Sequence, residues 1–185
     1  MHYCVCVIHR DGTDIDDIMR PYDESLEIQK IVEEDGYEYW TNPNAKWDWY
    51  EIGGRWKDSL KLKSGKHVDS ALVKDIDTSF DMGRYDIALK YWDDVMSGAL
   101  VPILESKQTL LQNFISRENY AALQAIFYYP YVINHKGEWH QMWDETWQTT
   151  LPNRLEWAQK FYTNFIRPII NSRESYRLTV VDIHN

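Results

Sequence analysis

The first residues of the sequence form an apolar, strand-like segment, which constrains the fold more than any other part of the chain. Successive side chains of a strand point to opposite faces, so residues 2–9 divide into two sets. Both sets are apolar: Tyr3, Val5 and Val7 on one face, and Cys4, Cys6 and Ile8 on the other. A strand with two apolar faces is favoured where both sides of a sheet are covered. We therefore expect this segment at the centre of a sheet.

Patterns elsewhere in the chain predict further helices and strands. Apolar spacing and capping signals predict helices over 81–97 with Gly98 just after its end, over 116–123 with Ser116 as N-cap, and from Asn153 to a break or kink at Pro168. Runs of β-favouring residues predict strands at 56–63, 125–133, 138–142 and 176–184. Together these elements predict one α+β domain over residues 1–185. It would hold a mainly antiparallel central sheet, with the first and last strands central and two or three helices packed on it.

Composition narrows the class of protein. A chain of 185 residues can bury a core of its own, and 44% hydrophobic residues exclude a disordered chain. No apolar run approaches the roughly 20 residues of a membrane-spanning helix, and the first residues lack the pattern of a signal peptide. Cys4 and Cys6 share one face of a strand, where a disulfide is poorly placed. We expect a cytoplasmic protein with no cofactor and no membrane association.

The most unusual stretch runs from Asn42 to Trp56 and combines three tryptophans, a Gly-Gly pair and several charges. Its Asn-Pro-Asn start predicts a turn, and Gly53-Gly54 permits a bulge or a close backbone approach. Its candidate ligand-binding or catalytic residues are Lys46, Asp48, Tyr50 and Arg55, which could hold a phosphate or an acyl group. The alternative is structural, with an internal Asp48–Arg55 salt bridge and the tryptophans in the core.

Acidic residues crowd the start of the chain. The net charge is −9, and residues 1–38 hold eleven acidic residues against three basic ones. The candidate partner-binding carboxylates are Asp14, Asp16, Asp17, Asp23 and Glu24. A solvated surface loop is the alternative, and the spacing of a calcium-binding loop is missing. Such a charge distribution argues against direct nucleic-acid binding by the whole surface.

The last strand carries a second pair of candidate catalytic residues, Asp182 and His184. Both lie on one face of the strand, so Asp182 could orient His184 as a general base; the alternative is a pair that simply meets solvent at the end of a sheet. Asp69, Asp75 and Asp77 could collect a divalent cation with Asp48, but their spacing is loose. We expect no metal site, and no ligand role for His135 or His140.

Residues 42–56 also carry a resemblance. The sequence Asn-Pro-Asn-Ala-Lys-Trp-Asp-Trp-Tyr-Glu-Ile-Gly-Gly-Arg-Trp resembles the signature of a family of uncharacterised bacterial and phage proteins. Residues 21–24, 69–77, 137–139 and 178–184 resemble other parts of the same family. The family has no established activity, but the resemblance implies an origin in phages or mobile elements. Proteins of that origin include inhibitors of host defence, among them anti-CRISPR proteins.

Two function classes follow. The first is a non-enzymatic interaction protein whose acidic surface blocks a defence nuclease of the host. That nuclease would target nucleic acids and could be a Cas nuclease or another defence nuclease. The second is an enzyme or small-ligand binder that acts on a phosphate-bearing or nucleotide-like molecule through Lys46, Asp48, Tyr50 and Arg55. The first is favoured, because no complete set of catalytic residues can be assembled from spacing alone.

Overall fold

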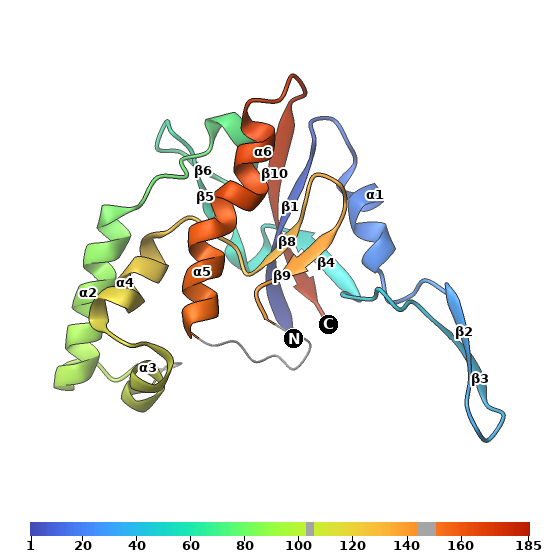
Figure 1. The fold of residues 1–185 in the computed structure, drawn as a ribbon, viewed down its shortest axis with the longest axis horizontal. Helices are drawn as coiled ribbons and strands as arrows, with labels where there is room; N and C mark the ends of the chain where they lie inside the picture. Colours follow the sequence, from blue (N-terminus) through green and yellow to red (C-terminus); the bar gives the residue numbers. More distant parts are fainter. Residues whose placement is uncertain (103–105, 144–150) are drawn as a thin grey trace. The chain divides into compact units, whose positions relative to one another are not determined.

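The computed structural model describes residues 1–102, 106–143 and 151–185, and the side chains of 151–153 are left out of the description. The fold is α+β with a mainly antiparallel sheet, as the sequence predicts (Figure 1). The described residues cluster in two compact units. The first unit comprises residues 1–77, 130–140 and 169–185, and the second comprises 78–129 and 141–168.

A six-stranded sheet is the centre of the first unit. Its strands follow the order β4-β10-β1-β8-β9, and β7 also pairs with β10. Their bounds are β1 His2–Arg10, β4 Trp49–Ile52, β7 Ser70–Leu72, β8 Tyr131–Ile133, β9 Trp139–Gln141 and β10 Tyr176–His184. Among these pairings β1 with β8 is parallel, whereas β10 is antiparallel to β1, β4 and β7.

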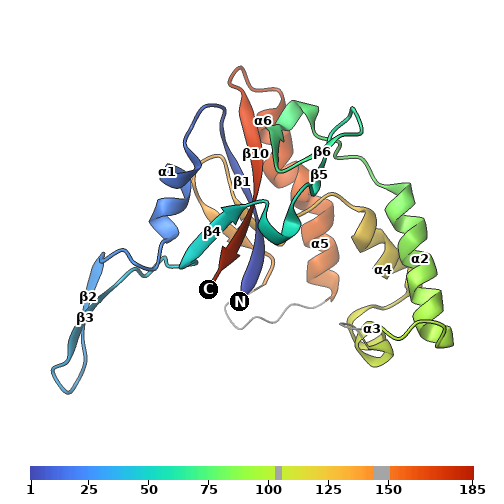
Figure 2. The ribbon, with the colours of Figure 1, turned by 180° about the vertical axis from the view of Figure 1, so that it is seen from behind.

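The first and last strands are central, which confirms the prediction from their apolar faces. β1 and β10 pair along all nine of their residues, from His2 opposite His184 to Arg10 opposite Tyr176. Figures 1 and 2 both show these strands side by side. The interior of the pair is fully buried, with Val5, Val180 and their neighbours inaccessible to solvent. Cys4 and Cys6 are buried free thiols in this pair.

Shorter elements complete the first unit. They are helix α1 Ile15–Met19, strands β2 Gln29–Val32 and β3 Glu38–Thr41, strands β5 Leu60–Lys61 and β6 His67–Val68, and 3-10 turns at Arg20–Tyr22, Gly54–Trp56 and Val73–Asp75. Strands β2 and β3 pair only with each other, as do β5 and β6. The strand expected at 56–63 is reduced to Leu60–Lys61, because Trp56 ends a 3-10 turn and Asp58 has a positive φ of 57°. Leu60 is buried, as its alternation predicts.

Helices make up most of the second unit. They are α2 Met82–Ser97, α3 Lys107–Asn113, α4 Arg117–Ala125 and α5 Leu151–Phe161, followed by a π-helical segment at Tyr162–Ile166. Helix α6 Arg167–Ile170 continues this last helix into the first unit. The core of the second unit gathers Trp92, Leu110, Tyr120, Ala121 and Ala158.

Capping residues set the helix ends that the sequence predicts. Gly98 ends α2 in the left-handed conformation at φ 79°, and Ser116 caps α4 by accepting a hydrogen bond from the Asn119 amide. The kink expected at Pro168 is preceded by the π-helical segment, which fits a residue that lacks an amide donor. None of the helices in the described ranges is long and apolar enough to cross a membrane.

The strand expected at 125–133 is wrong over its first half. Ala125 belongs to α4, and strand β8 starts only after Pro130. An apolar run without a clear period does not distinguish a buried helix end from a strand. The hairpin turn expected at 134–137 is present, with the Gly137 amide donating to the Asn134 carbonyl at 2.8 Å.

Candidate functional site

The tryptophan-rich stretch is anchored at its start by Asn42. This buried amide donates to the carbonyls of Pro21 and Asp23 at 2.9 and 2.8 Å, and its oxygen accepts from the Asn44 amide at 2.9 Å. Trp47 is buried as well, and its indole donates to the Met19 carbonyl at 3.1 Å. The Asn-Pro-Asn turn thus fastens the stretch to the end of α1.

The two glycines of the stretch make room for two carboxylates. Gly53 and Gly54 have φ values of +74° and +49°, and a Cβ atom would lie 2.6 Å from Asp69 Cγ at the first and 2.4 Å from Asp182 Cβ at the second. The same carboxylates accept backbone amides that follow the glycines: Asp58 donates to Asp69, and Arg55 donates to Asp182 at 3.0 Å. This part of the motif is structural, since it seats the turn against the sheet.

Beside this turn, two histidines and two aspartates meet at one end of the sheet. His2 Nδ1 lies 2.9 Å from Asp182 Oδ1, and His184 Nδ1 lies 2.9 and 3.0 Å from the two oxygens of Asp48. The two imidazoles touch with centroids 5.1 Å apart, and Trp49 stacks on His184 at 5.7 Å and 10°. We call these five residues the histidine–aspartate cluster; they come from β1, β10, β4 and the residue before β4.

The cluster has the geometry of general acid–base chemistry. Each Nδ1 atom faces a carboxylate, so the Nε2 atom of a neutral ring is left as proton acceptor. Desolvation raises the pKa of the Asp48 carboxyl, but the hydrogen bond and the charge of His184 outweigh it and hold that pKa below its ordinary 3.8. Asp48 and His184 have side chains about one third exposed, at 34% and 35%, whereas Asp182 is buried at 2%. The Asp48–His184 pair is therefore the more accessible part of the cluster.

The cluster lacks an activated thiol. Cys4 is the residue opposite Asp182 in the strand register. Burial and the negative charge of Asp182 raise the pKa of its thiol to about 12, so it stays protonated and is a poor nucleophile. In the part of the chain that the structure describes, no three histidine, cysteine or acidic side chains converge as a metal site would require.

The candidate residues Lys46, Asp48, Tyr50 and Arg55 do not converge on one site. Lys46 Nζ lies over the Trp139 ring at 5.9 Å, and the Tyr50 hydroxyl donates to Asp16. The Asp48 carboxylate pairs with His184, and within the described ranges it forms no ion pair with Arg55. Asp48 precedes β4, whose bounds are Trp49–Ile52, so the alternation of that strand does not extend to its side chain. The tryptophans divide similarly, since Trp47 is core and Trp49 is 44% exposed.

Asp182 and His184 do not pair with each other, so the predicted catalytic pair is not formed. The two residues share a face of β10, but each is paired with a residue from another segment, Asp182 with His2 and His184 with Asp48. These partners come from other strands of the fold, so the spacing within β10 does not reveal them.

Other predicted candidates have local roles. Asp69 accepts the Asp58 amide, while Asp77 pairs with Lys61 at 3.5 Å, so these carboxylates have separate partners. His135 packs edge-on against Tyr176, and His140 Nε2 lies 2.8 Å from the Asn134 side-chain amide.

The acidic candidates lie on α1 and the segment after it, and they are of two kinds. Asp14, Asp16 and Asp23 take part in local structure: Asp14 caps α1, Asp16 accepts from Tyr50, and Asp23 accepts the Ser25 amide at 2.8 Å. Asp17 and Glu24 are exposed. The acidic segment therefore presents free negative charge while part of it also stabilises the turn around α1.

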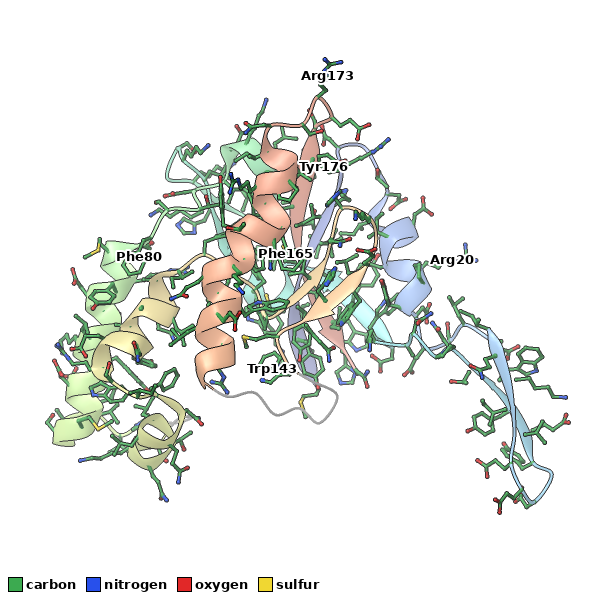
Figure 3. The ribbon with its side chains drawn as sticks, viewed as in Figure 1. Arg20, Phe80, Trp143, Phe165, Arg173 and Tyr176 are labelled. Atoms are coloured by element: carbon green, nitrogen blue, oxygen red, sulfur yellow. The ribbon has the colours of Figure 1, made fainter. Side chains whose placement is uncertain are left out.

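The sequence analysis missed the β2–β3 hairpin, which carries more exposed acid than α1. Asp35-Gly36 between two segments of β-favouring residues was the available signal. Its aromatic and aliphatic side chains are exposed as well, with Tyr37 at 62%, Trp40 at 52% and Val32 at 59%. Figure 3 shows side chains standing out from both faces of these two strands.

Comparison with known proteins adds no relative to this description. The likeness of residues 42–56 to a phage and bacterial family therefore stays a prediction from sequence. Searches of family models, of curated proteins and of solved structures find no match to this chain.

Proposed function

We propose that this chain is a non-enzymatic interaction protein of phage or mobile-element origin, working in the cytoplasm of a bacterial host. It would occupy the basic, nucleic-acid-binding surface of a defence nuclease, such as an RNA-guided Cas nuclease. The observation that carries the proposal is the exposure of the early acidic residues on α1 and on the β2–β3 hairpin. Asp17, Glu24, Glu27, Glu33, Glu34 and Asp35 all lie at the surface.

In the described part of the chain, most of these acidic residues have no basic side chain paired with them. Lys30 is the basic residue of the hairpin, and it pairs with Glu38 at 2.6 Å. An acidic surface of this kind speeds encounter with a positively charged groove and competes there with nucleic-acid phosphates. Binding of this kind weakens steeply as salt is raised.

The histidine–aspartate cluster favours a second candidate, a small-ligand enzyme. Its support is the Asp48–His184 pair, about one third exposed, which has the geometry of a general base and its orienting carboxylate. The phosphate-binding role of Lys46 loses support, because its Nζ lies over the Trp139 ring while the Tyr50 hydroxyl donates to Asp16. Asp48→Asn separates the two candidates: it abolishes an enzymatic activity and leaves an interaction through the acidic surface unchanged.

The proposal is tested first by affinity capture from a nuclease-treated host lysate at low and high salt. The bait is the protein or its Asp17→Lys, Glu24→Lys, Glu34→Lys variant, and bound proteins are identified by mass spectrometry. We expect a nucleic-acid-binding partner that is retained by the wild type at low salt only. A matched control carries the same charge change on the second unit, at the exposed residues Asp86, Glu118 and Glu156.

Displacement then tests competition directly. The purified partner is bound to a fluorescein-labelled DNA or RNA substrate, and anisotropy is followed as the protein is added. Wild type and control variant should release the substrate, whereas the acidic-surface variant should not. Equal release by all three proteins, or a captured partner whose nucleic-acid binding is unaffected, would contradict the proposal.

A further inference from the structure

The β2–β3 hairpin is a structured element that the rest of the chain leaves uncovered. Ile31 pairs with Tyr39 and Lys30 with Trp40 across the strands. The tip is closed by hydrogen bonds from the Glu33 amide to the Tyr37 carbonyl and from the Gly36 amide to the Glu33 carbonyl, both 2.9 Å. At its base, Asn42 holds the returning strand to the segment after α1. The hairpin therefore has a defined conformation from tip to base.

Both faces of this hairpin carry apolar side chains in water. Val32 and Trp40 lie on one face, and Tyr39 lies on the other; Tyr37 is at the tip with its ring 5.9 Å from that of Tyr39. Figures 1 and 2 show the two strands extending from the first unit with neither face against the six-stranded sheet. An isolated two-stranded hairpin is marginally stable in water, and contiguous exposed apolar surface marks interaction sites.

Charge argues for a cationic partner and against a second copy of this chain. The tip is Glu33-Glu34-Asp35, and in the described part of the chain these carboxylates have no ion-pair partner. Two copies that met through their hairpin tips would bring like charges together, which repulsion disfavours. A positively charged surface gains from the same arrangement.

The combination of aromatic rings with free carboxylates points to arginine more than to lysine. A guanidinium stacks on the faces of tryptophan and tyrosine and is bound bidentately by carboxylates, whereas a lysine ammonium is a strongly hydrated point charge. Tyr37, Tyr39 and Trp40 supply exposed rings within the same element as Glu33 and Glu34. Both kinds of contact are thus available to one guanidinium-bearing surface.

We infer that the β2–β3 hairpin is a docking arm that binds an arginine-rich surface of the partner protein. The inference rests on the proposed function and specifies it, because arginine-lined grooves are what nucleic-acid-binding proteins offer to phosphates. Carboxylates at the tip pair with the guanidinium groups, and the aromatic rings stack on them. The tip thereby supplies charge complementarity, and the rings supply the preference for arginine.

Full-length protein titrated with nona-arginine and nona-lysine peptides tests the inference without a known partner. The peptides carry equal charge, so any difference in Kd reports the chemistry of the cation. We expect nona-arginine to bind about five- to tenfold more tightly. Backbone amide NMR shifts on titration should map to residues 28–41.

Substitutions then locate the preference. The Tyr37→Ala, Trp40→Ala double variant should lower the arginine-to-lysine affinity ratio to about one while retaining charge-driven binding of both peptides. A matched control, Phe80→Ala with Tyr162→Ala, removes exposed aromatic rings from the second unit and should keep the ratio. Circular dichroism and thermal unfolding confirm that each variant is folded.

Several results would overturn the inference. They are equal affinity for the two peptides, shifts that map away from the hairpin, a ratio unchanged in the double variant, and a hairpin-dependent dimer in sedimentation. A failure of this inference can be distinguished from a failure of the proposed function. Arginine-selective binding by the hairpin without displacement of nucleic acid from a nuclease contradicts the proposed function alone, and displacement unaffected by the hairpin variants contradicts the inference alone.

Discussion

Two antiparallel strand pairs of the same unit differ in what covers them. β1–β10 lies at the middle of a six-stranded sheet and is buried along most of its length, whereas β2–β3 pairs only with itself and is exposed. Both contain β-branched and aromatic residues, so strand propensity does not separate them. The separation lies in the faces, because β1 is apolar on both and the hairpin mixes rings with carboxylates. The pair that holds the fold together and the pair we propose for binding are therefore different elements.

Replacing one isoleucine in β1 and one beside the β2–β3 hairpin gives the largest expected contrast in stability. Ile8 is 1% exposed in β1, and Ile8→Ala should destabilise the protein by about 2–5 kcal/mol through lost burial and a cavity. Ile28 borders the hairpin at 53% exposure, and Ile28→Ala should change stability by less than about 0.5 kcal/mol. Denaturant unfolding measures both. Equal losses would mean that the hairpin is packed as tightly as the sheet.

Glycine substitutions sharpen the comparison next. Gly54→Ala adds a Cβ 2.4 Å from Asp182 Cβ at a positive φ, so we expect a loss of about 2–4 kcal/mol. Gly36→Ala in the hairpin turn also has a positive φ but meets open space, and the loss should be about 1 kcal/mol. Thermal unfolding of the two variants checks the order, which would fail if the Gly36 variant were the less stable.

The sheet should also respond to pH through His9. Burial lowers the pKa of this imidazole; its hydrogen bond to the Arg10 carbonyl and Asp11 oppose the shift, while the charge of Arg177 adds to it. The unfolded chain therefore takes up the proton first. Stability should be constant well above pH 6.5 and fall below it, by at most about 1.4 kcal/mol per pH unit for one group.

His9→Gln provides the control for that pH dependence. Its unfolding free energy, measured between pH 5 and 8, should show a shallower decline on the acid side than that of the wild type. An identical decline would assign the effect to other groups. Thr179, which lies 3.0 Å from His9 Nε2, keeps its second partner Ser70 in this variant.

The smallest change in stability is expected at the hairpin tip. Glu33→Gln with Glu34→Gln removes exposed charges that have no ion-pair partner in the described structure, so the unfolding free energy should shift by less than about 0.5 kcal/mol. Binding to nona-arginine should weaken, and its dependence on salt should become shallower. A variant that binds as tightly as the wild type at low salt would place the docking charge elsewhere.

Local signals in the sequence were sufficient for several elements. Apolar side chains on both faces located β1, and hydrogen bonds within a few residues located the ends of helices at Gly98 and Ser116. An apolar run of uncertain period led to the strand wrongly extended back to Ala125. Capping signals within one turn of the chain were therefore sufficient for these helix ends.

The candidate site was less predictable because its contacts are long-range. Spacing within β10 placed Asp182 and His184 on one face but did not reveal their partners, His2 and Asp48, which other segments bring to the sheet. Gly53-Gly54 was noticed for its flexibility, yet the two carboxylates that require it come from Asp69 and Asp182. The β2–β3 hairpin was not predicted, because acidic residues interrupt its short alternating pattern.

The pairing of β1 with β10 also affects how the protein folds during its synthesis. Every residue of β1 pairs with a residue of β10 that is distant in the sequence, with Val5 opposite Val181. This pairing cannot form before residues 176–184 have left the ribosome, so β1 lacks its β10 neighbour while the intervening residues are synthesised. Long loop closure of this kind slows folding and exposes an aggregation-prone edge. We therefore expect the central β1–β10 pairing to form late in folding.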